Sequence, residues 1–124
     1  MMTASLKPNL QLLYVSDIQR STMFYRQLLQ AAPVFVSPRY VAFSAGGEAL
    51  FALWSGGGEP DAQAPRYSEI GIMLPGGDAV DRVYEAWKKH PDVRIVQAPH
   101  TAVFGRTFVA ADPDGHWIRV CPLD

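Results

Sequence analysis

One arrangement of strands and helix occurs twice along this chain of 124 residues. In each half an expected strand is followed by an amphipathic helix and then by three short strands rich in β-branched or aromatic residues, an order written βαβββ. The halves span about 8–55 and 66–124, and a stretch rich in Gly, Pro and Ala, 55–65, joins them. The repeat predicts an α+β fold in a single domain, 1–124, built from two equivalent modules.

The expected elements are recognised by their periodicity and by the residues at their ends. Asp17 and Asp78 are expected to cap the two helices, and Pro33 and Pro91 to end them. We expect strands at 10–15, 34–36, 40–44, 48–54, 69–74, 93–96, 104–111 and 116–121, with helices at 18–30 and from 78 to about 90.

A βαβββ sheet has its helix on one face, so two such sheets can curve together and share their uncovered faces as a cleft. Because side chains alternate across a strand, the sequence assigns a face to each residue. In the last strand Ile118 and Val120 are expected to face the helix. The residues expected to face the cleft are Leu10, Leu12, Tyr14, Glu69, Gly71, Met73, Trp117, Arg119 and Cys121.

The fourth strand is placed by comparison with the eighth. Aligning the halves at Gly47 and Gly115 pairs Phe51 with Arg119, which predicts that Phe51 also faces the cleft. The alternation does not decide the face of Trp54, which ends that strand beside the Gly-rich linker.

The predicted cleft is aromatic and apolar with one pair of opposite charges, a composition typical of small-molecule pockets. Aromatic rings and a guanidinium can stack on a flat ligand. Glu69 and Arg119 are expected either to bind the ligand or to form a structural ion pair. The candidate ligand-binding residues are Tyr40, Phe43, Phe51, Trp54, Glu69, Met73, Phe104, Trp117 and Arg119.

The composition argues against several classes of partner. The formal net charge is −1, from 11 basic and 12 acidic residues without a basic cluster, so we expect no nucleic-acid partner. No apolar segment approaches the roughly 20 residues of a membrane span, so we expect no membrane partner. A single cysteine, Cys121, and the lack of a signal-peptide core indicate a cytoplasmic protein.

Two segments carry a family resemblance: YVSDIQRSTMFYRQLL at 14–29 and FGRTFVAADPDGHWIRV at 104–120. Together with the repeat they resemble the vicinal oxygen chelate superfamily, which includes glyoxalases, bleomycin-resistance proteins and extradiol dioxygenases. The resemblance covers nearly the whole chain and is nearest to small drug-binding members such as those for phenazine antibiotics. It implies the glyoxalase/bleomycin-resistance fold, with a curved mixed sheet, and a homodimer.

Catalytic members of this superfamily hold a divalent metal through four cleft residues, usually His or Glu. The resemblance carries those positions to Leu10, Phe51, Glu69 and Arg119. Leu and Phe offer no donor atom, and Arg keeps its proton and repels a cation. A stable site needs at least three protein donors, so we expect no metal and no other cofactor.

The segment from Asp112 to Gly115 combines carboxylates with a following histidine, His116, and so invites a metal-site interpretation. Asp, Pro and Gly in this order are typical of a turn, and we predict a turn with His116 at a strand edge. His100 is expected in a loop near the cleft rim.

We predict a non-enzymatic binding protein that sequesters a planar aromatic small molecule, such as a phenazine- or bleomycin-type antibiotic. Sequestration requires only affinity and sufficient protein. One alternative is a metal-dependent lyase, isomerase or dioxygenase of the glyoxalase type, in which a one-residue shift of the first strand would offer Asn9 and Gln11 as donors. The other is a protein-interaction module with a vestigial cleft.

Overall fold

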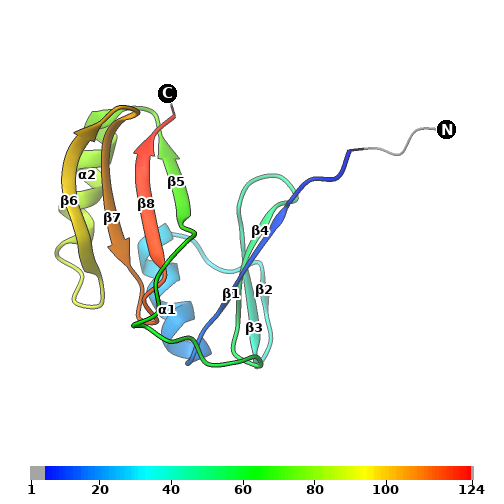
Figure 1. The fold of residues 1–124 in the computed structure, drawn as a ribbon. Helices are drawn as coiled ribbons and strands as arrows, with labels where there is room; N and C mark the ends of the chain where they lie inside the picture. Colours follow the sequence, from blue (N-terminus) through cyan, green and yellow to red (C-terminus); the bar gives the residue numbers. More distant parts are fainter. Residues whose placement is uncertain (1–4, 124) are drawn as a thin grey trace. The chain divides into compact units, whose positions relative to one another are not determined.

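The computed structural model describes residues 5–123, which divide after Pro60 into two compact units. Each unit has one helix and one four-stranded sheet (Figure 1), so the predicted α+β class and the repeated βαβββ order are confirmed. Unit 1 contains β1 (Leu10–Tyr14), α1 (Ile18–Leu29), β2 (Phe35–Val36), β3 (Tyr40–Ser44) and β4 (Leu50–Trp54). Unit 2 contains β5 (Ile70–Leu74), α2 (Gly77–Trp87), β6 (Arg94–Ala102), β7 (Gly105–Ala111) and β8 (Trp117–Pro122).

The two sheets have the same topology, with strand orders β1-β4-β3-β2 and β5-β8-β7-β6. In each sheet the first strand of the unit pairs in parallel with the last strand, and the other neighbours are antiparallel. Parallel pairing needs a long crossover connection, which here includes the helix. We call the sheet face that points away from the helix of the same unit the helix-free face.

The capping residues on either side of α1 determine where the helix begins and ends. The Asp17 carboxylate accepts the backbone N–H of Arg20 at 3.0 Å, which confirms the predicted N-cap. At the other end Gln30 adopts a left-handed conformation with φ of 53°, and its N–H bonds the carbonyl of Arg26. With 12 and 11 residues, α1 and α2 are the helices of the described chain, and neither is long and apolar enough to span a membrane.

The core of unit 1 lies between α1 and the sheet face that α1 covers. Phe24, Tyr25 and Leu28 of α1 are buried, and the Tyr25 ring meets that of Phe51 edge-on with 4.8 Å between centroids. Leu53, two residues further along β4 and on the same face, is fully buried. Burial of these side chains is the main source of stability for a helix of this length.

The core of unit 2 is built around Phe108 of β7. Its ring makes edge-on contacts with Tyr84 and Trp87 of α2, at 5.4 and 5.6 Å between centroids. Ile118 and Val120 of β8 are fully buried, and Val120 pairs with Phe108 in the sheet. The face predicted for these two β8 residues is therefore confirmed.

The start of α2 differs from the prediction. The N-cap is Gly76, which has no side chain to cap the helix, and α2 begins at Gly77. Asp78 lies in the first turn instead of at the N-cap. Its carboxylate still favours the helix at that position, because the N-terminal end of the helix dipole is positive.

Strand β6 is longer than predicted, with nine residues in place of four. Its register against β7 shifts between Ile95 and Gln97 and again between Gln97 and His100. Such irregularities interrupt the period-two alternation of side chains by which a strand is recognised in a sequence. His100, expected in a loop, lies in β6 opposite Thr107. Phe104, expected at the start of a strand, lies in the turn between β6 and β7.

The Asp-Pro-Asp-Gly segment forms the predicted turn between β7 and β8. The Gly115 N–H bonds the Asp112 carbonyl at 2.9 Å, and Gly115 has φ of 86°. One Asp112 carboxylate oxygen accepts the backbone N–H groups of Asp114, at 2.9 Å, and His116, at 2.8 Å. The Asp112 carboxylate therefore stabilises the turn, as Asp side chains commonly do.

Candidate functional site

The helix-free face of unit 2 carries a bidentate ion pair between Arg119 and Glu69. Arg119 Nε and Nη2 donate to the two oxygens of Glu69 at 2.7 and 3.0 Å. Glu69 directly precedes β5, and β5 pairs with β8, so the sheet topology brings these distant residues together. The side chain of Arg119 is 23% exposed and that of Glu69 is 32% exposed, which leaves the pair accessible to a ligand.

Two further contacts hold the Arg119 guanidinium in place. Nη1 donates to the Thr107 hydroxyl oxygen at 3.2 Å, and that hydroxyl donates to the Val120 carbonyl at 2.8 Å. The Phe104 ring lies 5.7 Å from the guanidinium carbon, a cation–π distance. Among the described residues, Glu69 and Thr107 use three of the five guanidinium N–H groups, which leaves two for an external acceptor.

The two charges stabilise each other electrostatically. The hydrogen bond from Arg119 lowers the pKa of the Glu69 carboxyl, and this effect and the attraction of the guanidinium outweigh the opposing effect of burial. The same bond raises the pKa of Arg119. Both groups are therefore ionised at neutral pH, and together they carry no net charge.

Apolar and aromatic side chains surround the pair on β5 and β8. Trp117 is partly exposed and lies two residues before Arg119, so it shares the helix-free face. Met73, which pairs with Cys121 in the sheet, is 62% exposed. The predicted orientation of Trp117, Arg119 and Cys121 away from the core is confirmed by the full burial of the residues between them.

The helix-free face of unit 1 carries an aromatic row, consisting of Tyr14, Trp54, Tyr40 and Phe35. Trp54 pairs with Tyr14 on one side and with Tyr40 on the other, and residues paired in this way have side chains on the same face. The Phe35 ring lies 5.9 Å from that of Tyr40. The register therefore places Trp54 on the helix-free face, a question that the sequence left open.

The Gly-rich segment after β4 lies directly against this row. A Cβ atom built on Gly56 would overlap the Trp54 ring. One built on Gly57 would lie 2.5 Å from Cε2 of Tyr14 and 3.1 Å from Nε1 of Trp54. In contrast, Gly58 has no atom within 4 Å of such a Cβ. Glycine is therefore needed at two of these positions for close approach of the backbone to the rings.

Phe43 and Phe51 are on the opposite face from the one predicted. Both are buried beneath α1, with exposed fractions of 0% and 7%, and their rings lie 6.3 Å apart. Both occupy the unit 1 core. The prediction for Phe51 was wrong because Gly47 and Gly115 are not equivalent positions.

The hydrogen bonds of the two turns show the true alignment. The N–H of Ala45 bonds the carbonyl of Ala49, as the N–H of Asp112 bonds that of His116. Ala49 therefore corresponds to His116, and the position equivalent to Arg119 is Ala52. An error of one residue moves every side chain of a strand to the other face.

The structure also identifies residues that the sequence did not select. Thr107, which holds Arg119, is fully buried, and its face could have been inferred because Phe108 beside it faces α2. Tyr14 was expected on the uncovered face, and the register now places its ring next to Trp54. Phe35 joins the row through the β2–β3 pairing, which no local pattern indicates. His100 is exposed on β6, where its Nδ1 lies 3.0 Å from the Ala98 carbonyl oxygen.

The donor chemistry of these surfaces does not suit a divalent metal. With the turn alignment corrected, the four positions that the family resemblance assigned to metal ligands correspond to Leu10, Ala52, Glu69 and Arg119, and only Glu69 has a side-chain atom that can coordinate a cation. Both of its oxygens already accept hydrogen bonds from Arg119. Gln11, proposed as a donor for a shifted register, pairs with Phe51 and so belongs to the helix side. Within residues 5–123 no group of three His, Cys, Asp or Glu side chains is arranged to hold a metal ion.

Comparisons with a family model and with a known relative identify the same protein family. The model of the Glyoxalase/Bleomycin resistance protein/Dioxygenase superfamily matches residues 7–120. A phenazine antibiotic resistance protein, EhpR of Enterobacter agglomerans, is 58% identical over 122 residues, which are 97% of this chain and 95% of that protein.

Solved structures show the same fold. A protein of Agrobacterium tumefaciens solved by NMR has a TM-score of 0.81 at 30% identity, covering 97% of this chain and 99% of that one. The fosfomycin resistance protein FosX of Mesorhizobium loti has a TM-score of 0.70 at 23% identity, covering 96% and 92% respectively. At that identity FosX resembles this chain in fold alone.

Proposed function

Because this chain belongs to the glyoxalase/bleomycin resistance protein/dioxygenase superfamily, we propose that it binds a planar aromatic antibiotic of the phenazine type and protects by sequestration. The observation that carries the proposal is the Arg119 guanidinium, which Glu69, Thr107 and Phe104 hold on the helix-free face of unit 2 with two N–H donors remaining. The relative named for phenazine antibiotic resistance supports this ligand class.

The surface around Arg119 suits a flat heteroaromatic ring. Phe104 and Trp117 provide ring faces and Met73 an adaptable apolar side chain, while the fixed guanidinium offers N–H donors to a ring nitrogen, carbonyl or carboxylate. Since the partners of Arg119 hold its orientation, the Arg119 side chain loses little conformational entropy when the ligand binds. In unit 1 the aromatic row offers a further stacking surface, on which Trp54 and Tyr40 are the predicted ligand-binding residues.

Binding without chemical change is favoured by the groups present. Of the four positions that hold a metal in catalytic relatives, two carry hydrocarbon and one carries the permanent cation of Arg119. The carboxylate at the fourth, Glu69, is engaged by that cation and has a lowered pKa, which makes it a weak base. Sequestration needs none of these groups to react.

We further propose that the protein acts as a homodimer. The helix-free faces expose large apolar side chains, including Leu10 at 51% and Met73 at 62%. Exposed apolar surface of this kind is typical of contacts with a second subunit or a ligand.

The proposal is tested by titrating the protein with phenazine-1-carboxylic acid while following tryptophan fluorescence. We expect saturable quenching at one ligand per chain, and recovery of the ligand unchanged in mass after incubation. Arg119→Ala should weaken binding about tenfold or more, because a charge-assisted hydrogen bond and a stacking contact are lost. Turnover of the ligand, or quenching that does not saturate and is unaffected by Arg119→Ala, would contradict sequestration at this surface.

A further inference from the structure

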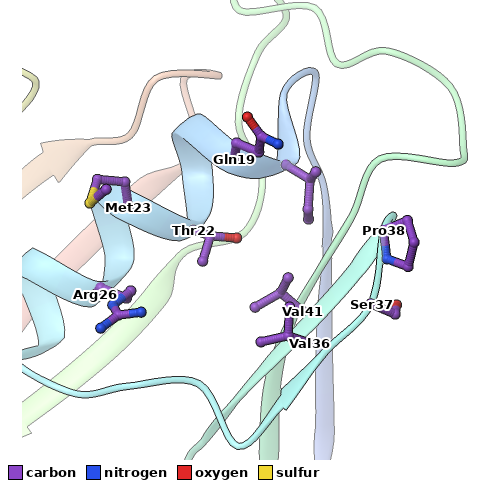
Figure 2. A pocket seen from close by; sticks show the side chains of 9 residues that line it. Gln19, Thr22, Met23, Arg26, Val36, Ser37, Pro38 and Val41 are labelled. Carbon is purple, nitrogen blue, oxygen red and sulfur yellow. The ribbon is translucent and has the colours of Figure 1, made fainter.

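A groove in unit 1 lies on the other side of the sheet from the aromatic row. It runs between α1 and the β2–β3 hairpin and has a volume of about 690 Å³, within the usual range for small-molecule sites. Figure 2 shows helix side chains on one side of it and those of the hairpin on the other. The residues lining it are Ile18, Gln19, Thr22, Met23, Arg26, Val36, Ser37, Pro38 and Val41.

The groove has an apolar floor formed by two paired strands. Val36 of β2 pairs with Val41 of β3, so both side chains point to the same side, toward α1. Val41 is buried, but Val36 is 65% exposed. Met23 of α1 also lines the groove, is 58% exposed and has a flexible side chain that adapts to irregular shapes. An apolar chain or ring placed here would cover these exposed side chains.

The groove is electrostatically one-sided. Arg26 is the only charged residue among the nine that line it, and no residue in the described part of the chain forms an ion pair with Arg26. Its main chain is held by the C-terminal cap of α1, where its carbonyl accepts the N–H groups of Gln30 and Ala31. The positive charge of Arg26 interacts favourably with the negative C-terminal end of the helix dipole, but this interaction does not require the Arg26 side chain to line a groove.

The groove also contains a hydroxyl whose bonding is incomplete. The Thr22 oxygen is buried, and within residues 5–123 it has no hydrogen-bond partner. An unpaired buried hydroxyl is unfavourable, and Thr in a helix has two accessible rotamers. Figure 2 shows this hydroxyl on the side of α1 that faces the hairpin, one helical turn before Arg26, where it can donate to an acceptor carried by a molecule in the groove.

We propose that this groove binds a small amphipathic carboxylate. The apolar part would lie between Val36, Val41 and Met23, and the carboxylate would accept hydrogen bonds from Arg26. An anion is favoured because the lining offers one unpaired cation and no carboxylate. The residues that line this groove belong to unit 1, whereas Arg119 belongs to unit 2.

The test uses the whole protein labelled with ¹⁵N and sodium octanoate as the probe, below the concentrations at which octanoate forms micelles. We expect saturable shifts of the backbone amides of Thr22, Met23, Arg26 and Val36. Arg26→Gln should lower the affinity for octanoate about tenfold. Octanamide, which lacks the negative charge, should bind the unaltered protein more weakly than octanoate does by a similar factor.

Arg20→Gln is the matched control, because Arg20 lies on the same helix, is exposed and does not line the groove. It should leave the affinity for octanoate unchanged, and so should Arg119→Ala, which separates this proposal from the phenazine site. The proposal is wrong if the shifts do not saturate, if they centre on the helix-free faces, or if Arg26→Gln and Arg20→Gln bind equally. A further contradicting outcome concerns the oligomeric state. If Val36→Glu converts a dimer to a monomer, and octanoate does not shift the groove amides of the unaltered protein, the groove is a contact between copies of the chain and the proposal is wrong.

Discussion

The Arg119 guanidinium and the Glu69 carboxylate meet through two parallel hydrogen bonds of 2.7 and 3.0 Å. Side-on pairing of this kind fixes the plane of the guanidinium as well as its position. Because Thr107 and Phe104 restrain it further, the remaining N–H groups point in set directions. The ion pair is thus both a structural contact, as one of the two sequence-based interpretations held, and the proposed means of orienting a ligand.

Glu69→Gln should separate these two roles. Loss of the charge should lower the free energy of unfolding by about 1 kcal/mol or less, as for other partly exposed pairs. The affinity for phenazine-1-carboxylate should rise a few-fold, because the amide oxygen still accepts a hydrogen bond that orients Arg119, while the negative charge that repels the ligand carboxylate is lost. Denaturant unfolding and fluorescence titration measure the two effects. Glu85→Gln, which breaks an exposed pair with Lys88, is the control and should leave the affinity unchanged.

The ion pair should also give a defined dependence of stability on pH. Since the pKa of Glu69 is lower in the folded protein than in the unfolded chain, its stabilising contribution is complete above the unfolded value, near 4.3. It is lost as the pH falls below that value and through the lower folded pKa. The difference in unfolding free energy between the unaltered protein and Glu69→Gln should therefore be constant from pH 7 to about 5 and shrink toward pH 3. A difference that grew on acidification would contradict this assignment.

Glycine substitutions should test how the linker packs on the aromatic row. Gly57→Ala should displace the Tyr14 and Trp54 rings, lowering stability by about 1–3 kcal/mol and changing the near-ultraviolet circular dichroism. Gly58→Ala meets no neighbouring atom and should stay within about 0.5 kcal/mol of the unaltered protein, with an unchanged spectrum. Equal effects of the two substitutions would show that the rings do not lie against Gly57.

Two phenylalanines predicted for one site should behave in opposite ways. Phe51→Ala removes a buried ring that packs on Tyr25 and should destabilise the protein by about 3–5 kcal/mol. Phe104→Ala, in a half-exposed turn, should cost less than about 1 kcal/mol but weaken phenazine-1-carboxylate binding several-fold. Thermal unfolding and titration of both variants provide the comparison. If Phe104→Ala bound the ligand normally, its stacking on Arg119 would have no part in recognition.

The amino-acid sequence alone determined the repeated βαβββ order, the α+β class, the Asp17 cap and the turn from Asp112 to Gly115, because each depends on neighbours a few residues apart. Alternation within β8 also predicted which side of the sheet Trp117 and Arg119 occupy. The pairing of Glu69 with Arg119 was expected as one possibility because both were assigned to the same face.

Only the tertiary structure decided the faces of Phe51 and Trp54, the contacts of Thr107 and Phe104 with Arg119, and the joining of the aromatic row across four strands. The physical reason is that side-chain alternation has a period of two and is local to one strand. Which face is which depends on the register with neighbouring strands. That register is set by turn hydrogen bonds and by burial against the helix. The two turns have the same length, but Gly47 lies one position earlier in its turn than Gly115 does, and an alignment on these glycines therefore reverses every assignment in the strand that follows.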